Sequence, residues 1–77
     1  MDIKELNRRI GLFCKQFREN HLEIGLTEFC EITNQNIKNV NAFEYGRANN
    51  IKYLYYYYKL ADEEKRELFS RYIFELM

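Results

Sequence analysis

The sequence has no proline, no tryptophan and only three glycines, while 47% of its residues are hydrophobic. This composition excludes a disordered, Pro- and Gly-rich tail and is typical of a globular domain. No apolar run approaches the roughly 20 residues that a membrane-spanning helix needs, because the longest, residues 54–58, is mostly tyrosine. No signal peptide is recognised at the start of the chain, so we expect neither a membrane protein nor a secreted one.

Residues that carry catalytic or metal-binding chemistry are equally few. A structural zinc site takes four Cys or His ligands, and the chain has two cysteines, Cys14 and Cys30, and one histidine, His21. Both cysteines lie among apolar residues at helical spacing, which favours buried free thiols in a reducing compartment. Ser70 is the only serine, and no motif places a base beside it. We therefore expect no enzyme activity, no metal and no cofactor.

Apolar residues recur at steps of three and four through most of the chain, which is the spacing of one helix face. This pattern predicts an all-α fold, a compact domain of five helices spanning residues 1–77. The expected helices cover about residues 3–20, 22–31, 34–43, 50–60 and 62–76. The expected N-caps of the last three are Thr33, Asn49 or Asn50, and Asp62, because these side chains accept hydrogen bonds from first-turn amides.

The apolar spacing between residues 23 and 42 favours a helix-turn-helix unit, in which two helices cross at a tight turn over a small core. With Glu23 as the first position of a twenty-residue unit, the fairly small Thr27 is fifth and Glu31 is ninth. Apolar residues then occupy the fourth, eighth, tenth, fifteenth and eighteenth positions, which are Leu26, Cys30, Ile32, Ile37 and Val40.

Other residues strengthen this pattern. Arg18 stands near the end of the first helix, Ile32-Thr33 at the turn, and residues 43–47 read Phe-Glu-Tyr-Gly-Arg. Together these features resemble the Cro and phage-repressor (XRE-type) helix-turn-helix family, and so imply a lambda-repressor-like fold. Two departures are Glu31, where the family has a glycine in a left-handed turn, and three extra residues between Val40 and Glu44. By the resemblance, Glu44 forms a buried ion pair with Arg18.

The resemblance implies that the third helix enters the major groove of DNA. The residues expected to read bases are Thr33, Asn34, Gln35, Lys38 and Asn39. Asn and Gln amides match adenine in bidentate fashion and Lys suits guanine or a phosphate, so an A/T-rich operator follows; the alternative is that the amides reflect only a coding bias. The residues expected to hold the phosphate backbone are Arg47, Asn49, Asn50 and Lys52.

Charge neither excludes nor requires DNA binding. Twelve basic residues balance twelve acidic ones, but residues 33–61 carry a net +3 and residues 21–32 a net −3. Positive charge thus gathers on the expected recognition helix and the segment after it, as binding to phosphates requires. Glu23 and Glu28 oppose it at the start of the second helix, so we expect weak affinity in a monomer.

The expected fourth helix has apolar residues on two faces, one of which must fill the core. We expect a dimer or partner contact on the face that carries Tyr53, Tyr56, Tyr57 and Leu60, since tyrosine is enriched at interfaces. The alternative is that a small domain simply leaves tyrosines half-buried. A symmetric homodimer would present two recognition helices about 34 Å apart to a palindrome.

The leading hypothesis is a sequence-specific DNA-binding regulator of Cro/repressor type, encoded by a phage or mobile element. Its partner would be double-stranded DNA, and its location the cytoplasm of a bacterial host, at the nucleoid. The alternative is a small phage-type inhibitor, such as an anti-CRISPR or other anti-host protein, that uses the same fold to bind a host protein. A third hypothesis is an antitoxin that binds its toxin through the tyrosine face.

Overall fold

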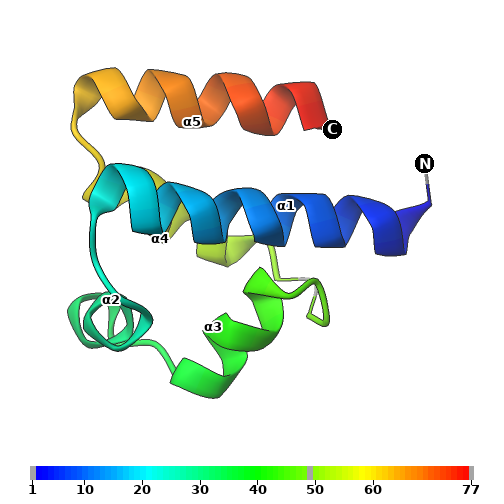
Figure 1. Cartoon of the computed structure of the whole chain (residues 1–77), viewed down its shortest axis with the longest axis horizontal. Coiled ribbons are helices and arrows are strands. Elements are labelled where there is room, and N and C mark those ends of the chain that lie inside the picture. The colour runs from blue at the N-terminus through cyan, green and yellow to red at the C-terminus, as the bar shows by residue number, and fades with distance from the viewer. Residues whose placement is uncertain (1, 49, 77) are drawn as a thin grey trace.

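The computed structural model describes residues 2–48 and 50–76, which form five α-helices and one turn of π-helix (Figure 1). The elements are α1 (Ile3–Phe17), η1 (Arg18–Leu22), α2 (Leu26–Thr33), α3 (Ile37–Glu44), α4 (Lys52–Leu60) and α5 (Glu63–Leu76). The described residues contain no strand, so the predicted all-α, five-helix domain is confirmed. None of these helices is both long and apolar enough to cross a membrane.

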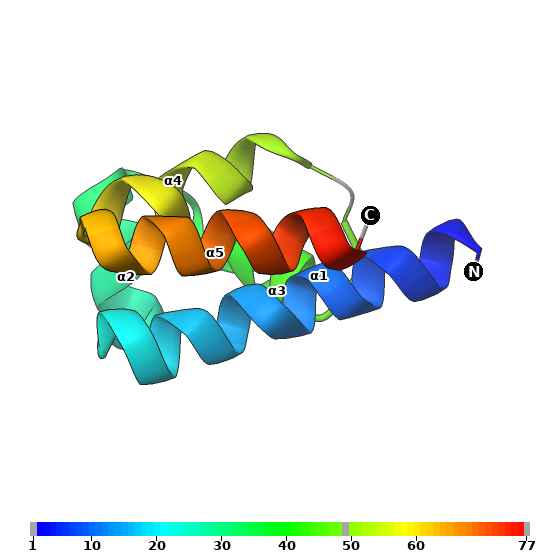
Figure 2. The ribbon, with the colours of Figure 1, turned by 90° about the horizontal axis from the view of Figure 1, so that it is seen from above.

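The helices pack on both sides of α1. In Figure 1, α5 runs antiparallel to α1 along one side, while α2 and α3 lie on the other. Seen from above in Figure 2, α5 lies between α1 and α4 and contacts both of them. The start of α1 and the end of α5 therefore lie at the same end of the molecule. The side of α1 against which α2 and α3 lie is not covered by α5.

The hydrophobic core forms where the five helices meet. Every helix contributes two buried apolar side chains to it, which are adjacent in α2 and three or four positions apart, on one face, in the other four helices. The ten are Cys14, Phe17, Phe29, Cys30, Val40, Phe43, Tyr53, Tyr57, Phe69 and Ile73. Aromatic rings dominate its centre, where Phe29 stacks on Tyr57 with ring centroids 4.5 Å apart. This packing fixes the phase of each helix and thereby decides which residues face outward.

Gly11 allows α1 and α3 to approach closely. A Cβ atom at this position would lie 2.7 Å from the carbonyl oxygen of Glu44 and would also meet that of Phe43. Both oxygens belong to the backbone at the end of α3, so no side-chain rotation could relieve the clash. The absence of a side chain at Gly11 is therefore what sets the spacing between the two helices.

Both cysteines are buried free thiols, as the sequence predicted. Burial raises the pKa of Cys14 well above its usual range, and the nearby carboxylate of Glu44 raises it further. The same two causes, in the same order, raise the pKa of Cys30. Because the thiolate is the reactive form, both residues act as small apolar core side chains.

The end of the first helix and the start of the second differ from the prediction. The first helix continues into the π-helical turn η1, which ends at Leu22. Leu22 was expected to begin the second helix. Glu23 then adopts a left-handed conformation with φ 57° and ends this turn. Helix α2 begins only at Leu26, after Gly25 in an extended conformation at the N-cap. The predicted boundary was wrong because Glu seldom adopts positive φ, so its residue type gives no sign of a break.

Candidate nucleic-acid interface

The turn between α2 and α3 consists of Asn34, Gln35 and Asn36. Asn34 adopts the left-handed conformation, with φ 55°. Asn36 is the N-cap of α3, and its Oδ1 accepts a hydrogen bond from the backbone N–H of Asn39 at 3.1 Å. The prediction that Thr33 caps this helix was wrong: Thr33 ends α2, and its hydroxyl donates to the carbonyl oxygen of Phe29 at 2.7 Å.

The predicted helix-turn-helix pattern can be compared with the buried residues in two registers, one that begins at Glu23 as predicted and one that begins three residues later, at Leu26. When Glu23 is the first position, the tenth and fifteenth are Ile32 and Ile37, whose side chains are 54% and 44% exposed. When Leu26 is first, the ninth position is the left-handed Asn34. The fourth, fifteenth and eighteenth positions are then Phe29, Val40 and Phe43, all of which are buried, while the eighth and tenth are the half-buried polar residues Thr33 and Gln35. The three apparently extra residues before Glu44 disappear in this register.

Helix α3 turns a polar face outward. Its buried side carries Val40, Phe43 and Glu44. Since successive residues are about 100° apart around a helix, the opposite side carries Lys38 and Tyr45, both of which are exposed. Residues 39, 41 and 42, which are Asn, Asn and Ala, lie beside them and are exposed or half-buried.

The structure divides the five residues predicted to read bases into two groups. Lys38 and Asn39 are exposed in the first turn of α3, where the prediction needs them. Thr33, Asn34 and Gln35 lie before the helix begins and shape the turn; the Nε2 of Gln35 donates to the carbonyl oxygen of Thr33 at 3.1 Å. The sequence missed Tyr45, the exposed C-cap of α3, because it placed the end of this helix at Phe43.

A basic hollow lies beside the end of α3. It has a volume of about 570 Å³ and is lined by Lys4, Asn7 and Arg8 of α1 and by residues 45–47, which are Tyr, Gly and Arg. None of these described lining residues is acidic. Arg8 also lies 2.7 Å from the exposed carboxylate of Glu5, while the guanidinium of Arg47 lies 5.6 Å from the ring centroid of Tyr45. Three cations from two distant segments thus surround one open space.

Gly46 makes this approach of the two segments possible. It adopts φ +76°, and a Cβ atom there would lie 2.6 Å from the Cγ of Arg8. Glycine is the residue that adopts this conformation without strain. The sequence indicated Gly46 as the end of the third helix, but it did not indicate that the glycine brings Arg8 next to Arg47.

The residues predicted to hold phosphates lie in and after this loop. Arg47 and Lys52 are exposed and Asn50 is half-buried, whereas Asn49 lies outside the described residues. Asn50 Oδ1 accepts a hydrogen bond from the backbone N–H of Lys52 at 3.3 Å, next to the N-cap Ile51. The prediction that Asn50 is the N-cap of α4 was wrong, since Asn50 lies one residue before the N-cap Ile51 and Lys52 is the first residue of the helix.

A buried ion pair fixes α3 against the rest of the domain. The Nε and Nη2 of Arg18 donate to the two carboxylate oxygens of Glu44, each at 2.9 Å. Arg18 Nη1 donates to the carbonyl oxygen of Ile24, and the hydroxyl of Tyr57 donates to Glu44 Oε2 at 2.6 Å. The ion pair predicted from the resemblance is confirmed. Glu44 raises the pKa of Arg18, and burial followed by Glu44 raises that of Tyr57.

The predicted tyrosine partner face does not lie on the surface. Tyr53 and Tyr57 are core residues, and Tyr56 and Leu60 are half-buried against the core. The exposed tyrosines of α4 are instead Tyr55 and Tyr58. The prediction was wrong because tyrosine at four consecutive positions gives no hydrophobic contrast between the faces of this helix.

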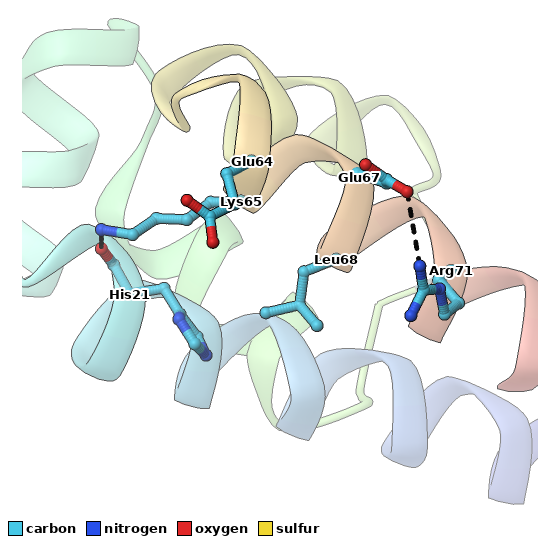
Figure 3. A pocket seen from close by; sticks show the side chains of 6 residues that line it. All are labelled: His21, Glu64, Lys65, Glu67, Leu68 and Arg71. Carbon is cyan, nitrogen blue, oxygen red and sulfur yellow. Dashed lines mark hydrogen bonds and ion pairs between the residues drawn. The ribbon is translucent and has the colours of Figure 1, made fainter.

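A second hollow lies between η1 and α5 and is shown in Figure 3. Its lining residues are His21, Glu64, Lys65, Glu67, Leu68 and Arg71. Lys65 Nζ donates to the carbonyl oxygen of His21 at 2.8 Å, and Arg71 pairs with Glu67 at 3.3 Å. In this hollow, charges of both signs lie side by side, in contrast to the purely basic hollow near α3. The described residues contain no group of three His, Cys, Asp or Glu that could hold a metal ion.

Comparison with known proteins finds no match: no family model, no curated protein and no solved structure is significantly similar to this chain.

Proposed function

We propose that the protein is a DNA-binding module that places the outward face of α3 in the major groove. More specifically, we propose a sequence-specific transcriptional regulator of the Cro/repressor kind, encoded by a phage or mobile element and acting in the bacterial cytoplasm. Such a regulator would act by occupying a promoter.

The observation that carries the proposal is the sign of the exposed charge around α3. Glu44 is the only acidic residue between positions 34 and 52, and it is buried against Arg18. The charges that this stretch exposes are therefore those of Lys38, Arg47 and Lys52, all positive. A surface that approaches the phosphate backbone needs such an excess of positive charge even when the whole molecule is neutral.

In the proposed complex, the outward face of α3 would contact the bases, and the residues around the basic hollow would contact the phosphates. Lys38 and Asn39 lie in the first turn of α3, from which side chains of such a helix reach base edges. An Asn amide pairs with the N6 and N7 of adenine, which retains the hypothesis of an A/T-rich operator. Arg47, with Lys4 and Arg8 beside it, would hold phosphates and fix how the helix lies in the groove.

A second candidate function is a protein-binding inhibitor or an antitoxin built on the same fold. It is favoured by the acidic side chains that precede α3, since Glu23, Glu28 and Glu31 are all exposed. An acidic surface of this kind could compete for a basic, nucleic-acid-binding surface on a host or toxin protein. On DNA, the same three carboxylates would weaken binding if they approached a phosphate.

The test is binding of the purified protein to the DNA upstream of its own gene and to a scrambled duplex of equal composition, over a series of salt concentrations. We expect a preference for the native duplex that is lost in the double variant Lys38→Ala/Asn39→Ala. Lys59→Ala is the matched control, since it removes one exposed charge from the far end of α4. The proposal is wrong if the native duplex is not preferred at low salt, or if the control loses binding to the same extent.

A further inference from the structure

An apolar groove lies where η1 and α2 face the turn between α4 and α5. Its volume is about 280 Å³, and its lining residues are His21, Leu22, Ile24, Ile32, Leu60, Ala61, Asp62 and Lys65. It adjoins the hollow of Figure 3, because His21 and Lys65 line both. None of its lining residues belongs to α3 or to the loop after it. The groove is therefore separate from the surface proposed to bind DNA.

Ile32 is the aliphatic residue of the groove that the fold leaves exposed. Its side chain is 54% exposed, whereas the leucines and the other isoleucine of the groove are half-buried against the core. Glu28 lies one turn before Ile32 on the same face of α2, Glu31 directly precedes it, and both are exposed. Single exposed apolar residues are normal, but Ile32 extends a groove that other aliphatic side chains already line. This continuity indicates contact with an apolar group from outside the chain.

The two segments that line the groove carry an excess of negative charge. The segment 21–32, from η1 and α2, contains Glu23, Glu28 and Glu31 and no Lys or Arg. The segment 59–66, around the turn between α4 and α5, contains three acidic and three basic residues, of which Asp62 and Lys65 line the groove. The surroundings of the groove thus have a net charge of −3. Among the described residues, none of the carboxylates of these two segments lies in an ion pair.

The three cations of this region all contact other parts of the chain. Lys65 Nζ donates to the carbonyl oxygen of His21 at 2.8 Å, as Figure 3 shows. The Nζ of Lys59 lies 5.6 Å from the ring centroid of Tyr55, and Arg66 donates to two backbone carbonyl oxygens at the end of α4. The cations are therefore held by the fold, while the carboxylates of α2 are free to pair with a partner.

We propose that this groove is the docking site for a basic amphipathic segment of a partner protein. An aliphatic side chain of that segment would cover Ile32, and its Lys or Arg side chains would lie near Glu28 and Glu31. The apolar lining selects against a purely charged partner, and the net negative charge selects against nucleic acids and acidic proteins. The inference extends the second candidate function, to which it gives a specific site, and does not depend on DNA binding by α3.

The first experiment measures the binding of synthetic peptides to the full chain by fluorescence anisotropy at low salt. The main probe is a short amphipathic peptide with two leucines one helical turn apart among lysines. One comparison peptide has glutamate in place of every lysine, and the other has serine in place of both leucines. We expect the Lys/Leu peptide to bind about tenfold or more tightly than either of them, because only this peptide matches both the apolar lining and the charge. Added salt should weaken its binding.

Variants of the protein test the two parts of the site separately. Ile32→Ser should weaken binding of the Lys/Leu peptide about tenfold, because an apolar anchor carries much of an interface's binding energy. Leu12→Ser is its matched control, since Leu12 is 52% exposed on a helix and does not line the groove. Glu28→Gln/Glu31→Gln should reduce the preference for the Lys/Leu peptide over the Glu/Leu peptide. Glu75→Gln, which changes an exposed carboxylate in the last turn of α5, should not. Circular dichroism should show unchanged helicity in all four variants.

The α3 variant Lys38→Ala/Asn39→Ala should bind the Lys/Leu peptide as the wild type does, and Ile32→Ser should bind DNA as the wild type does. A failure of the docking site is thereby distinguished from a failure of DNA binding. The proposal is overturned if the Glu/Leu peptide binds as tightly as the Lys/Leu peptide, or if Ile32→Ser and Leu12→Ser have equal effects. It is also overturned if no peptide binds and Ile32→Ser instead weakens self-association in sedimentation equilibrium, since a second copy would then cover the groove.

Discussion

Glu44 connects three parts of the chain through its two carboxylate oxygens. The oxygens accept from Arg18 at the end of the first helix and from Tyr57 in α4, while Glu44 itself ends α3. A buried carboxylate is tolerated only when a cation and hydrogen-bond donors satisfy it, and all three donors are present. Glu44 thereby orients α3 while leaving no exposed negative charge on its outward face.

At this scale we predict that Tyr57→Phe lowers the free energy of unfolding by about 1–2 kcal/mol, because Glu44 loses one buried donor while the ring packing is retained. The matched control is Tyr56→Phe in the half-buried neighbour, which should change stability little. Urea denaturation of both variants measures the difference. Equal stability of Tyr57→Phe and the wild type would show that the 2.6 Å hydrogen bond contributes nothing.

The sequence predicted part of this cluster and not the rest. The pair Arg18–Glu44 follows from the resemblance, because both residues stand in recognisable motifs. The choice of Tyr57 from the run Tyr55 to Tyr58 does not follow, because four chemically identical residues point in four directions around a helix. Only the packing of α4 against Phe29 and Phe43 determines which hydroxyl points inward.

At the scale of elements, the two helices and the turn were predicted, but their register was not. A shift by three residues is nearly one helical turn, so an apolar pattern that fits one register almost fits the next. Asn34 is the residue that could have indicated where the turn lies, since Asn adopts the left-handed conformation more readily than Glu, the residue type at position 31. Placing the turn at Asn34 also removes the three unexplained residues before Glu44.

The observed N-cap of α3, Asn36, leads to a prediction for stability. Asn36→Ala should lower the free energy of unfolding by about 1 kcal/mol, because the hydrogen bond from Asn36 Oδ1 to the backbone of Asn39 is lost. Asn39→Ala is the control on the same helix and should be neutral or slightly stabilising, since alanine has the higher helix propensity. Thermal unfolding of the two variants compares them directly. An unaffected Asn36→Ala variant would contradict the observed start of α3.

At the scale of the whole molecule, a chain of zero net charge separates its charges by location. The basic residues at the start of α1 lie beside the basic loop after α3 and surround a common hollow. The segment 62–77, with its net negative charge, forms α5 on the other side of α1 (Figure 1). The charges of the sequence segments indicated an excess of positive charge after residue 33. They did not indicate that α1 adds its own basic residues to this surface, because the approach of α1 to the loop after α3 depends on Gly46 and on the tertiary fold.

This separation predicts how DNA binding responds to salt. For B-DNA, the logarithm of the binding constant falls with the logarithm of the salt concentration by about 0.9 per phosphate contact. The double variant Arg47→Gln/Lys52→Gln should therefore reduce the slope by about 2 and weaken native and scrambled duplexes alike. Lys59→Gln, which removes the same kind of charge from the end of α4, should leave the slope unchanged. An equal reduction of the slope in Lys59→Gln would mean that DNA responds to charge anywhere on the molecule rather than to the surface around α3.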